Sequence, residues 1–300
     1  GNKLLDACGP GGENLTRVVH MLTVYGDESH DEQRQRIFVV TGVLGSETDW
    51  RDVESQWLER LNGRTFHAAD WESQHARSED RDAHQRNLRT YADLVRILAK
   101  SKLWGFSAGV DLRAWNDVFP PDQVGEDLAY YKCFSEVVIY FANIGALSVP
   151  QEKVRFVLDR NFDREYTAHQ MYSYMGRNQD WPKRVWIHDE IASATLETTG
   201  IQVADLVARE AMKDFDNEYG PVRRPTRRSM QTLKDSGRFK FHYYMRGYLE
   251  QMRDSAKELA DRIGLYRDGY LQWLQQRRLT DTFAQRIKYL SHFDESERGS

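Results

Sequence analysis

The stretch Leu22-Thr23-Val24-Tyr25-Gly26-Asp27-Glu28-Ser29 is an apolar, β-branched run that ends in two acids and a hydroxyl. It predicts a first strand over Val18 to Gly26, with Asp27 directly after the strand. A carboxylate without a partner is costly inside a strand, because it must lose its water or become neutral. At a strand end it can meet water, a metal ion or a substrate. Asp27 is therefore the first candidate site residue.

Two other acids, Asp159 and Asp205, are also associated with apolar runs. Val154 to Leu158 is a nearly continuous apolar strand, and Asp159 comes directly after it. Asp205 lies in Ile201-Gln202-Val203-Ala204-Asp205-Leu206, an apolar run with helical spacing. We expect Asp27, Asp159 and Asp205 to converge at one edge of a sheet.

Each of these acids also has a structural interpretation. Asp27 can cap a turn after its strand. Asp205 can form an i,i+4 ion pair with Arg209, although its apolar neighbours disfavour a simple surface pair. Asp159 has three candidate arginine partners in the sequence, namely Arg155, Arg160 and Arg164.

Composition limits the class of protein. The chain has 300 residues, and its 40% hydrophobic and 29% charged residues are typical of a globular fold rather than a disordered chain. The net charge of −4 does not by itself favour or exclude a nucleic-acid partner. Cys8 and Cys133 are too few for a disulfide framework or a zinc site, which favours a reducing, cytoplasmic setting. No run approaches the ~20 apolar residues of a membrane helix, so we expect no membrane partner.

The remaining patterns predict an α/β fold, in which a mixed sheet is flanked by helices and followed by a C-terminal helical extension. Further strands are expected at Arg36–Leu44, Trp104–Leu112 and Val185–His188. Three parts follow: a flexible lead-in over 1–17, an α/β body over 18–219, and a basic linker with helices over 220–300. The helices of the last part are a candidate homo-oligomer interface.

Four short motifs, taken in order, resemble one family: Asp27-Glu28-Ser29, Phe66-His67-Ala68, Leu158-Asp159-Arg160 and Gln202–Leu206. Together they are similar to the bacterial domain-of-unknown-function 3800 family, which is regarded as ribonuclease-H-like. The resemblance covers roughly 18–219. It implies a mixed sheet whose second strand is antiparallel to its neighbours, and divalent-metal phosphodiester chemistry. It also implies a fourth acid, for which Asp70, Glu72 and Asp189 compete.

The three central acids suit a magnesium or manganese site. Mg²⁺ prefers hard oxygen ligands, and two such ions can activate water and stabilise the leaving oxygen of a phosphodiester. In this interpretation Asp27 is the central ligand, Asp159 holds one ion and Asp205 the other. The prediction is a metal-dependent nuclease that hydrolyses RNA or DNA with metal-activated water. The alternative is a catalytically inactive module on the same fold that binds nucleic acid or another partner.

Glu28 and His67 are the other catalytic candidates. Glu28 should point to the opposite side of the strand from Asp27, so a structural partner such as an arginine is an equal alternative. His67 can act as a general base or help the product to leave, and its structural alternative is a buried histidine with satisfied hydrogen bonds.

A cluster of arginines follows the expected body of the fold. Its members, predicted to contact phosphates, are Arg223, Arg224, Arg227 and Arg228. Aromatic residues between Phe239 and Tyr248 follow it and would suit stacking on unpaired bases. The alternative is a solvated linker that leads into a helical core.

Overall fold

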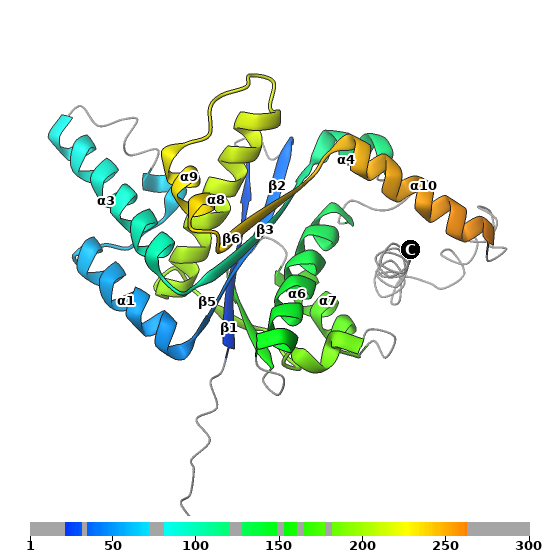
Figure 1. Cartoon of the computed structure of the whole chain (residues 1–300), viewed down its shortest axis with the longest axis horizontal. Helices are drawn as coiled ribbons and strands as arrows, with labels where there is room; N and C mark the ends of the chain where they lie inside the picture. The colour runs from blue at the N-terminus through cyan, green and yellow to red at the C-terminus, as the bar shows by residue number, and fades with distance from the viewer. Residues whose placement is uncertain are drawn as a thin grey trace, which may run out of the picture.

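The structure, a computed structural model, describes residues 22–31, 35–71, 81–119, 128–148, 153–160, 165–177 and 182–262. A sheet forms the middle layer, and helices cover both of its faces (Figure 1). The described elements are, in order, β1 (Leu22–His30), β2 (Ile37–Ser46), α1 (Glu47–Leu61), α3 (Arg81–Lys100), β3 (Trp104–Asp111), α4 (Leu112–Val118), α6 (Leu128–Ser148), β4 (Val154–Asp159), α7 (Glu165–Arg177), the 3₁₀ helix η1 (Pro182–Trp186), β5 (Ala192–Ala194), α8 (Thr199–Tyr219), α9 (Arg228–Asp235), β6 (Phe239–Tyr244) and α10 (Arg246–Arg262).

The sheet is mixed, with the strand order β5-β4-β1-β2-β3-β6. β2 is antiparallel to both of its neighbours, β1 and β3, as expected. The pairs β1–β4, β4–β5 and β3–β6 are parallel. The prediction of a mixed α/β sheet flanked by helices is therefore confirmed.

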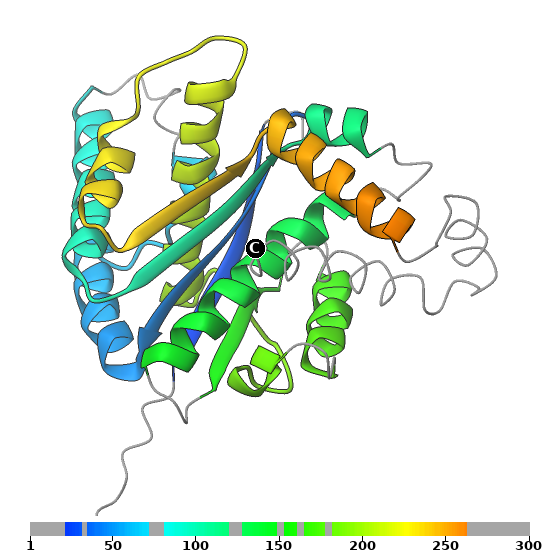
Figure 2. The same cartoon turned by 45° about the vertical axis from the view of Figure 1, so that its right-hand side comes forward.

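One face of the sheet packs against α4, α6, α7 and α10. Strand residues such as Val24 and Val40 contribute to this core, together with Phe141 of α6. α6 lies very close to β2, because a Cβ added to Gly42 would come within 2.6 Å of the Phe141 ring. Figure 2 shows α6 running along this face of the sheet.

The opposite face packs against α1, α3, α8 and α9. A capping box formed by Ser46 and Asp49 starts α1, and Asn62 in the left-handed conformation ends this helix. α8 approaches β1 at Gly200, where a Cβ would lie 2.4 Å from the Tyr25 ring. This close approach brings the helix that carries Asp205 onto the strand that carries Asp27.

Several boundaries differ from the sequence prediction. β1 continues through His30, so Asp27, Glu28 and Ser29 lie within the strand rather than after it. Pairing with β2 explains the extension, because Asp27 lies opposite Thr41 and His30 opposite Phe38. The lead-in 1–17 lies outside the described residues.

The prediction of a strand at Val185–His188 is wrong. Its first two residues belong to η1, and only Ile187 forms an isolated bridge, to Val154. On the side of β4 away from β1 the pairing strand is β5, which begins four residues after His188.

The expected boundary near Gly220 does not separate the sheet from a purely helical extension. β6 lies in the same sheet, parallel to β3, with Phe239 opposite Gly105. The C-terminal part does contain helix, since α10 is present and its Leu249 and Met252 are buried. Within the described ranges, no helix has the length and apolar character needed to cross a membrane.

Candidate functional site

Asp27 and Asp159 lie next to each other on neighbouring parallel strands. Gly26 of β1 pairs with Leu158 of β4, so the following residue on each strand is an acid. Alternation along β1 places Asp27 on the same face as Tyr25, which packs against α8. The register of β1 and β4 gives Asp159 the same orientation, since strands in register share their pleat. Both carboxylates therefore face the layer that contains α8.

Asp205 reaches this position from α8. Its Oδ2 accepts a hydrogen bond from the backbone N–H of Ala68, at a distance of 2.7 Å. The three acids are 8% (Asp27), 7% (Asp159) and 6% (Asp205) exposed, so all three are buried. The strands that carry Asp27 and Asp159 and the helix that carries Asp205 thus pack together, and both strand acids lie on the sheet face that α8 covers.

The electrostatics show that the three carboxylates interact. Burial raises the pKa of Asp27 well above its ordinary value, and the nearby Asp205 and Asp159 raise it further. The hydrogen bond from the backbone N–H of Glu28 to Asp27, 2.8 Å long, opposes this shift. Burial raises the pKa of Asp205 to about 6, and the charge of Asp159 acts in the same direction. Buried carboxylates that repel one another favour a proton or a cation between them.

These residues fit a divalent cation by the chemistry of their donors, although not by the positions of their side chains. Carboxylate oxygens are the ligands that Mg²⁺ prefers, and a cation would offset the burial and the repulsion that raise the pKa of Asp27 and Asp205. Yet in the part of the chain that the structure describes, no three or more His, Cys, Asp or Glu side chains are grouped closely enough to hold a metal ion. Asp27, Asp159 and Asp205 would have to draw together around an ion.

The segment that donates to Asp205 is held in place by Gln202, three residues earlier on α8. The Oε1 of Gln202 accepts hydrogen bonds from Trp57 Nε1 at 2.9 Å and from the backbone N–H of Phe66 at 3.3 Å. Its Nε2 donates to the carbonyl oxygen of Leu196 at 2.6 Å. Gln202 therefore fixes the Phe66–Ala68 segment against α8, and that segment in turn orients Asp205.

His67 lies beside this hydrogen bond but is not a buried histidine. Its side chain is 41% exposed, and its Nδ1 lies 2.8 Å from Asp70 Oδ2. Its charge, when it is protonated, lowers the pKa of Asp205, as does Arg209 one turn further along α8. Asp70 therefore orients His67. The sequence had made Asp70 a candidate for a fourth metal ligand, which is a different role.

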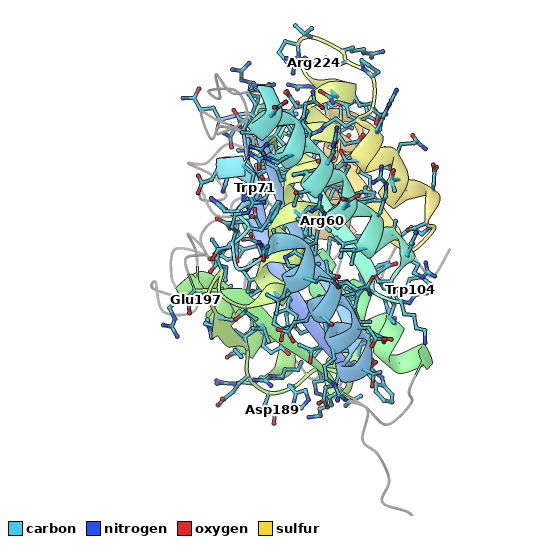
Figure 3. All side chains as sticks on the ribbon, turned by 90° about the vertical axis from the view of Figure 1, so that its left-hand side faces the viewer. Arg60, Trp71, Trp104, Asp189, Glu197 and Arg224 are labelled. Carbon is cyan, nitrogen blue, oxygen red and sulfur yellow. The ribbon has the colours of Figure 1, made fainter. Side chains whose placement is uncertain are left out.

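The other two candidates for a fourth acid lie elsewhere. Glu72 is outside the described residues. The Asp189 side chain is 93% exposed and pairs with Lys153 at 3.3 Å. Lys153 precedes β4, whereas Asp159 ends this strand, so Asp189 lies at the opposite end of β4. Figure 3 shows Asp189 and Arg224 at opposite ends of the molecule.

Glu28 points away from the three acids, as the alternation of β1 predicts. Its Oε1 lies 3.3 Å from Nε2 of His30, and its charge contributes to raising the pKa of Tyr130, which burial raises most. The structural partner is thus a histidine rather than an arginine. Within the described residues, Oε2 of Glu28 and Nδ1 of His30 are buried without a hydrogen-bond partner.

The arginines of the predicted phosphate-binding cluster differ in their surroundings. Arg227 lies 3.2 Å from the fully buried Glu210, which also accepts hydrogen bonds from Tyr91 and Ser229, each 2.6 Å long. Arg223, Arg224 and Arg228 are exposed and form no ion pair within the described residues. Arg227 therefore has a structural task, whereas the other three are accessible to a ligand.

Comparison with models of protein families, with curated proteins and with solved structures found no match to this chain. The resemblance to the domain-of-unknown-function 3800 family therefore stays a prediction.

Sequence reasoning missed the backbone N–H of Ala68 and the Asp70–His67 pair. A backbone donor leaves no signal in side-chain patterns. The spacing of His67 and Asp70, three residues apart, is compatible with one face of a helical turn and is the only signal that could have linked them.

Proposed function

We propose that this protein is a metal-dependent nuclease, which hydrolyses phosphodiester bonds of RNA or DNA with metal-activated water. The observation that carries the proposal is the burial of three acids on β1, β4 and the facing helix α8. Burial raises the pKa of Asp27 and of Asp205, and the charges of the neighbouring acids add to the shift. A structural ion pair does not explain why Asp27 is buried, since no cationic side chain among the described residues pairs with it. Strongly shifted carboxylates that share a site are typical of functional centres.

Each acid has a distinct role in this proposal. Asp27 is the central ligand, with Asp159 beside it on the neighbouring strand and Asp205 across from it on α8. The backbone N–H groups of Glu28 and Ala68 restrain one oxygen of Asp27 and of Asp205, respectively, and leave the other oxygen for an ion. When bound, a divalent ion supplies a water of lowered pKa and neutralises charge on the phosphate.

His67 is the proposed proton carrier at the edge of the site. Asp70 holds Nδ1, which leaves Nε2 of the partly exposed ring for the leaving group or for solvent. The ribonuclease-H-like character of the fold belongs to the same proposal. It is supported by the mixed sheet flanked by helices and by the antiparallel position of β2 between β1 and β3.

The test is cleavage of end-labelled oligonucleotides. Single-stranded DNA, single-stranded RNA, duplex DNA and an RNA–DNA hybrid are each incubated with Mg²⁺, with Mn²⁺ or with EDTA. We expect cleavage that needs the ion and falls at least 100-fold in the D27N variant, because electrostatic stabilisation by one group is commonly worth that much. D52N, an exposed acid on α1, is the matched control and should cleave like wild type. Equal cleavage by D27N and wild type contradicts the proposal.

The second candidate is a module that binds nucleic acid or another partner without turnover. It is favoured by the absence, among the described side chains, of a group arranged to hold a metal ion. It predicts salt-sensitive binding through exposed arginines such as Arg223 and Arg224, with the same affinity in Mg²⁺ and in EDTA. An affinity that rises with Mg²⁺ would reject this candidate.

A further inference from the structure

A pocket of about 240 Å³ lies near the C-terminal end of α8, on the same face of the sheet as Asp27. Residues from β2, the end of β3, α4 and α8 line it, together with the chain after α8. Those that matter here are Arg36, Asp111, Arg113, Phe215, Tyr219 and Pro221. In Figure 1 this end of α8 lies at the top of the molecule, beside the start of β2.

The pocket is within reach of a polymer that passes the three acids. Thr41, opposite Asp27, is four residues from Ile37 at the pocket, which is about 13 Å along β2. Along α8, Asp205 is ten residues from Phe215, which is about 15 Å. A ligand that reaches from the pocket to the acids must therefore be longer than one small molecule.

The cations around the pocket are of two kinds. Arg36 is held rigidly, since its Nη1 lies 2.9 Å from Asp216 and its Nε lies 3.9 Å from Asp31. Arg113 and Arg223 are exposed, and neither forms an ion pair with any described residue. Arg223 lies two residues after Pro221, which lines the pocket. Two uncommitted guanidinium groups at the rim suit phosphate oxygens.

An aromatic ring is anchored at the same rim. Tyr219 is 43% exposed, and its ring packs edge-on against Phe215 with centroids 5.7 Å apart. Phe215 in turn stacks on Tyr243 at 4.5 Å. Phe215 and Tyr243 thereby hold the ring of Tyr219 in place, while part of that ring stays exposed to solvent. Such a supported, exposed ring suits stacking by a planar base.

Asp111 supplies a hydrogen-bond acceptor inside the pocket. Its Oδ1 accepts from the backbone N–H groups of Arg113 at 3.0 Å and Ala114 at 3.1 Å, which orients the carboxylate. A carboxylate repels a phosphate placed beside it, but it accepts hydrogen bonds from the amino and imino groups of a nucleobase. The acid therefore favours a base rather than a phosphate in the interior, with the phosphates at the rim.

We propose that this pocket binds one unpaired nucleotide of a single-stranded nucleic acid. Its base lies between Tyr219 and Asp111, and its phosphates contact Arg113 and Arg223. The pocket is smaller than the roughly 300–1,000 Å³ of most small-molecule sites, as one base requires. A paired base cannot present its face and its edge in this way. The inference names the substrate class of the proposed nuclease and in that respect rests on the proposed function.

The test is fluorescence anisotropy of a dye-labelled 12-nucleotide single strand, as DNA and as RNA, in EDTA so that no cleavage occurs. We expect Y219A to weaken binding about 5- to 100-fold, as loss of one stacking contact does, and Y219F to bind like wild type. R113A should weaken binding and reduce the slope of log affinity against log salt by about 0.7. R51A, an exposed arginine on α1 whose side chain is 67% exposed, is the matched control and should bind like wild type.

Two results would overturn the inference. In the first, Y219A and R113A both bind the probe like wild type. In the second, an unlabelled duplex competes for binding as well as the unlabelled single strand does. If the variants lose binding as expected while wild type cleaves nothing in Mg²⁺ or Mn²⁺, the nucleotide site stands and the nuclease proposal fails. Cleavage by wild type, together with unchanged binding by both variants, overturns the pocket alone.

Discussion

The Oδ2 atom of Asp205 accepts a hydrogen bond from the backbone N–H of Ala68 across 137 residues of sequence, at a distance of 2.7 Å. This contact joins α8, which carries one acid of the candidate site, to the segment after α1. Because the donor belongs to the backbone, no side-chain substitution at position 68 other than proline removes it. The orientation of Asp205 therefore depends on how this segment is held, which is the task of Gln202.

The repulsion among the three acids predicts that neutralising one of them stabilises the metal-free protein. In EDTA at pH 8, D27N should melt at a higher temperature than wild type, by about 2–4 °C for each kcal/mol of repulsion removed. The reason is that burial and the charges of Asp205 and Asp159 disfavour the ionised form of Asp27. Thermal unfolding followed by circular dichroism measures the change, with D52N on α1 as the exposed control. A lower melting temperature for D27N under these conditions would refute the repulsion.

Asp205 predicts a definite pH dependence of stability in the metal-free state. Its pKa is raised from 3.8 to about 6 in the folded protein, so between these values the folded state binds more protons than the unfolded chain. The contribution of this carboxyl to the free energy of unfolding is therefore fully present below pH 3.8 and is lost as the pH rises through about 6. The loss amounts to roughly 3 kcal/mol at most.

The measurement for Asp205 is the melting temperature of wild type and D205N in EDTA between pH 4.5 and 8. Other groups titrate in both proteins, so the difference between the two curves isolates Asp205. D205N should gain stability relative to wild type as the pH rises through about 6. A difference that stays constant over this range would show that the pKa of Asp205 is not raised.

Gln202 predicts a coupled loss of stability and metal affinity. Replacing it by Leu leaves the buried N–H groups of Trp57 and Phe66 without their acceptor, which costs about 1–3 kcal/mol for each unsatisfied donor. The Phe66–Ala68 segment should then move. A bound metal ion stabilises the folded protein, so Mn²⁺ should raise the melting temperature of wild type and should raise that of Q202L less. Q56L, an exposed glutamine on α1, is the matched control. A Q202L protein with wild-type stability would mean that these hydrogen bonds do not hold the segment.

The arginine cluster predicts two different phenotypes. R227A removes the cation beside the fully buried Glu210 and should lower the free energy of unfolding by about 1–2 kcal/mol, a value reduced by the partial exposure of Arg227. R224A, at an exposed position, should change stability by less than about 0.5 kcal/mol. Urea unfolding compares the two variants directly. Equal stabilities would place Arg227 with the surface arginines, as the sequence alone suggested.

Local patterns were sufficient to predict much of the fold. The capping box at Ser46 and the buried apolar stripe of α1 both depend on residues close together in the sequence. The apolar run over Val154–Leu158 identified a central strand because a strand covered on both faces has little use for polar residues. The faces of Asp27 and Glu28 followed from the alternation of side chains along a strand.

Other features depend on partners that lie far away in the sequence. The segment Phe239–Tyr244 alternates as a strand does, but only its pairing with β3 distinguishes a sixth strand from an aromatic loop. The ion pair of Arg227 likewise depends on Glu210, which sequence patterns give no reason to place beside it. The strand expected at Val185–His188 failed because a short apolar run does not distinguish a strand from a 3₁₀ turn.

Calorimetric titration of the metal-free protein with Mn²⁺ at pH 7.5 tests the claim that Asp27, Asp159 and Asp205 hold a divalent cation together. We predict saturable binding by wild type and by D52N, and a loss of at least tenfold in affinity in each of D27N, D159N and D205N. Wild-type protein that binds no Mn²⁺, or three variants that bind it as wild type does, would contradict the claim.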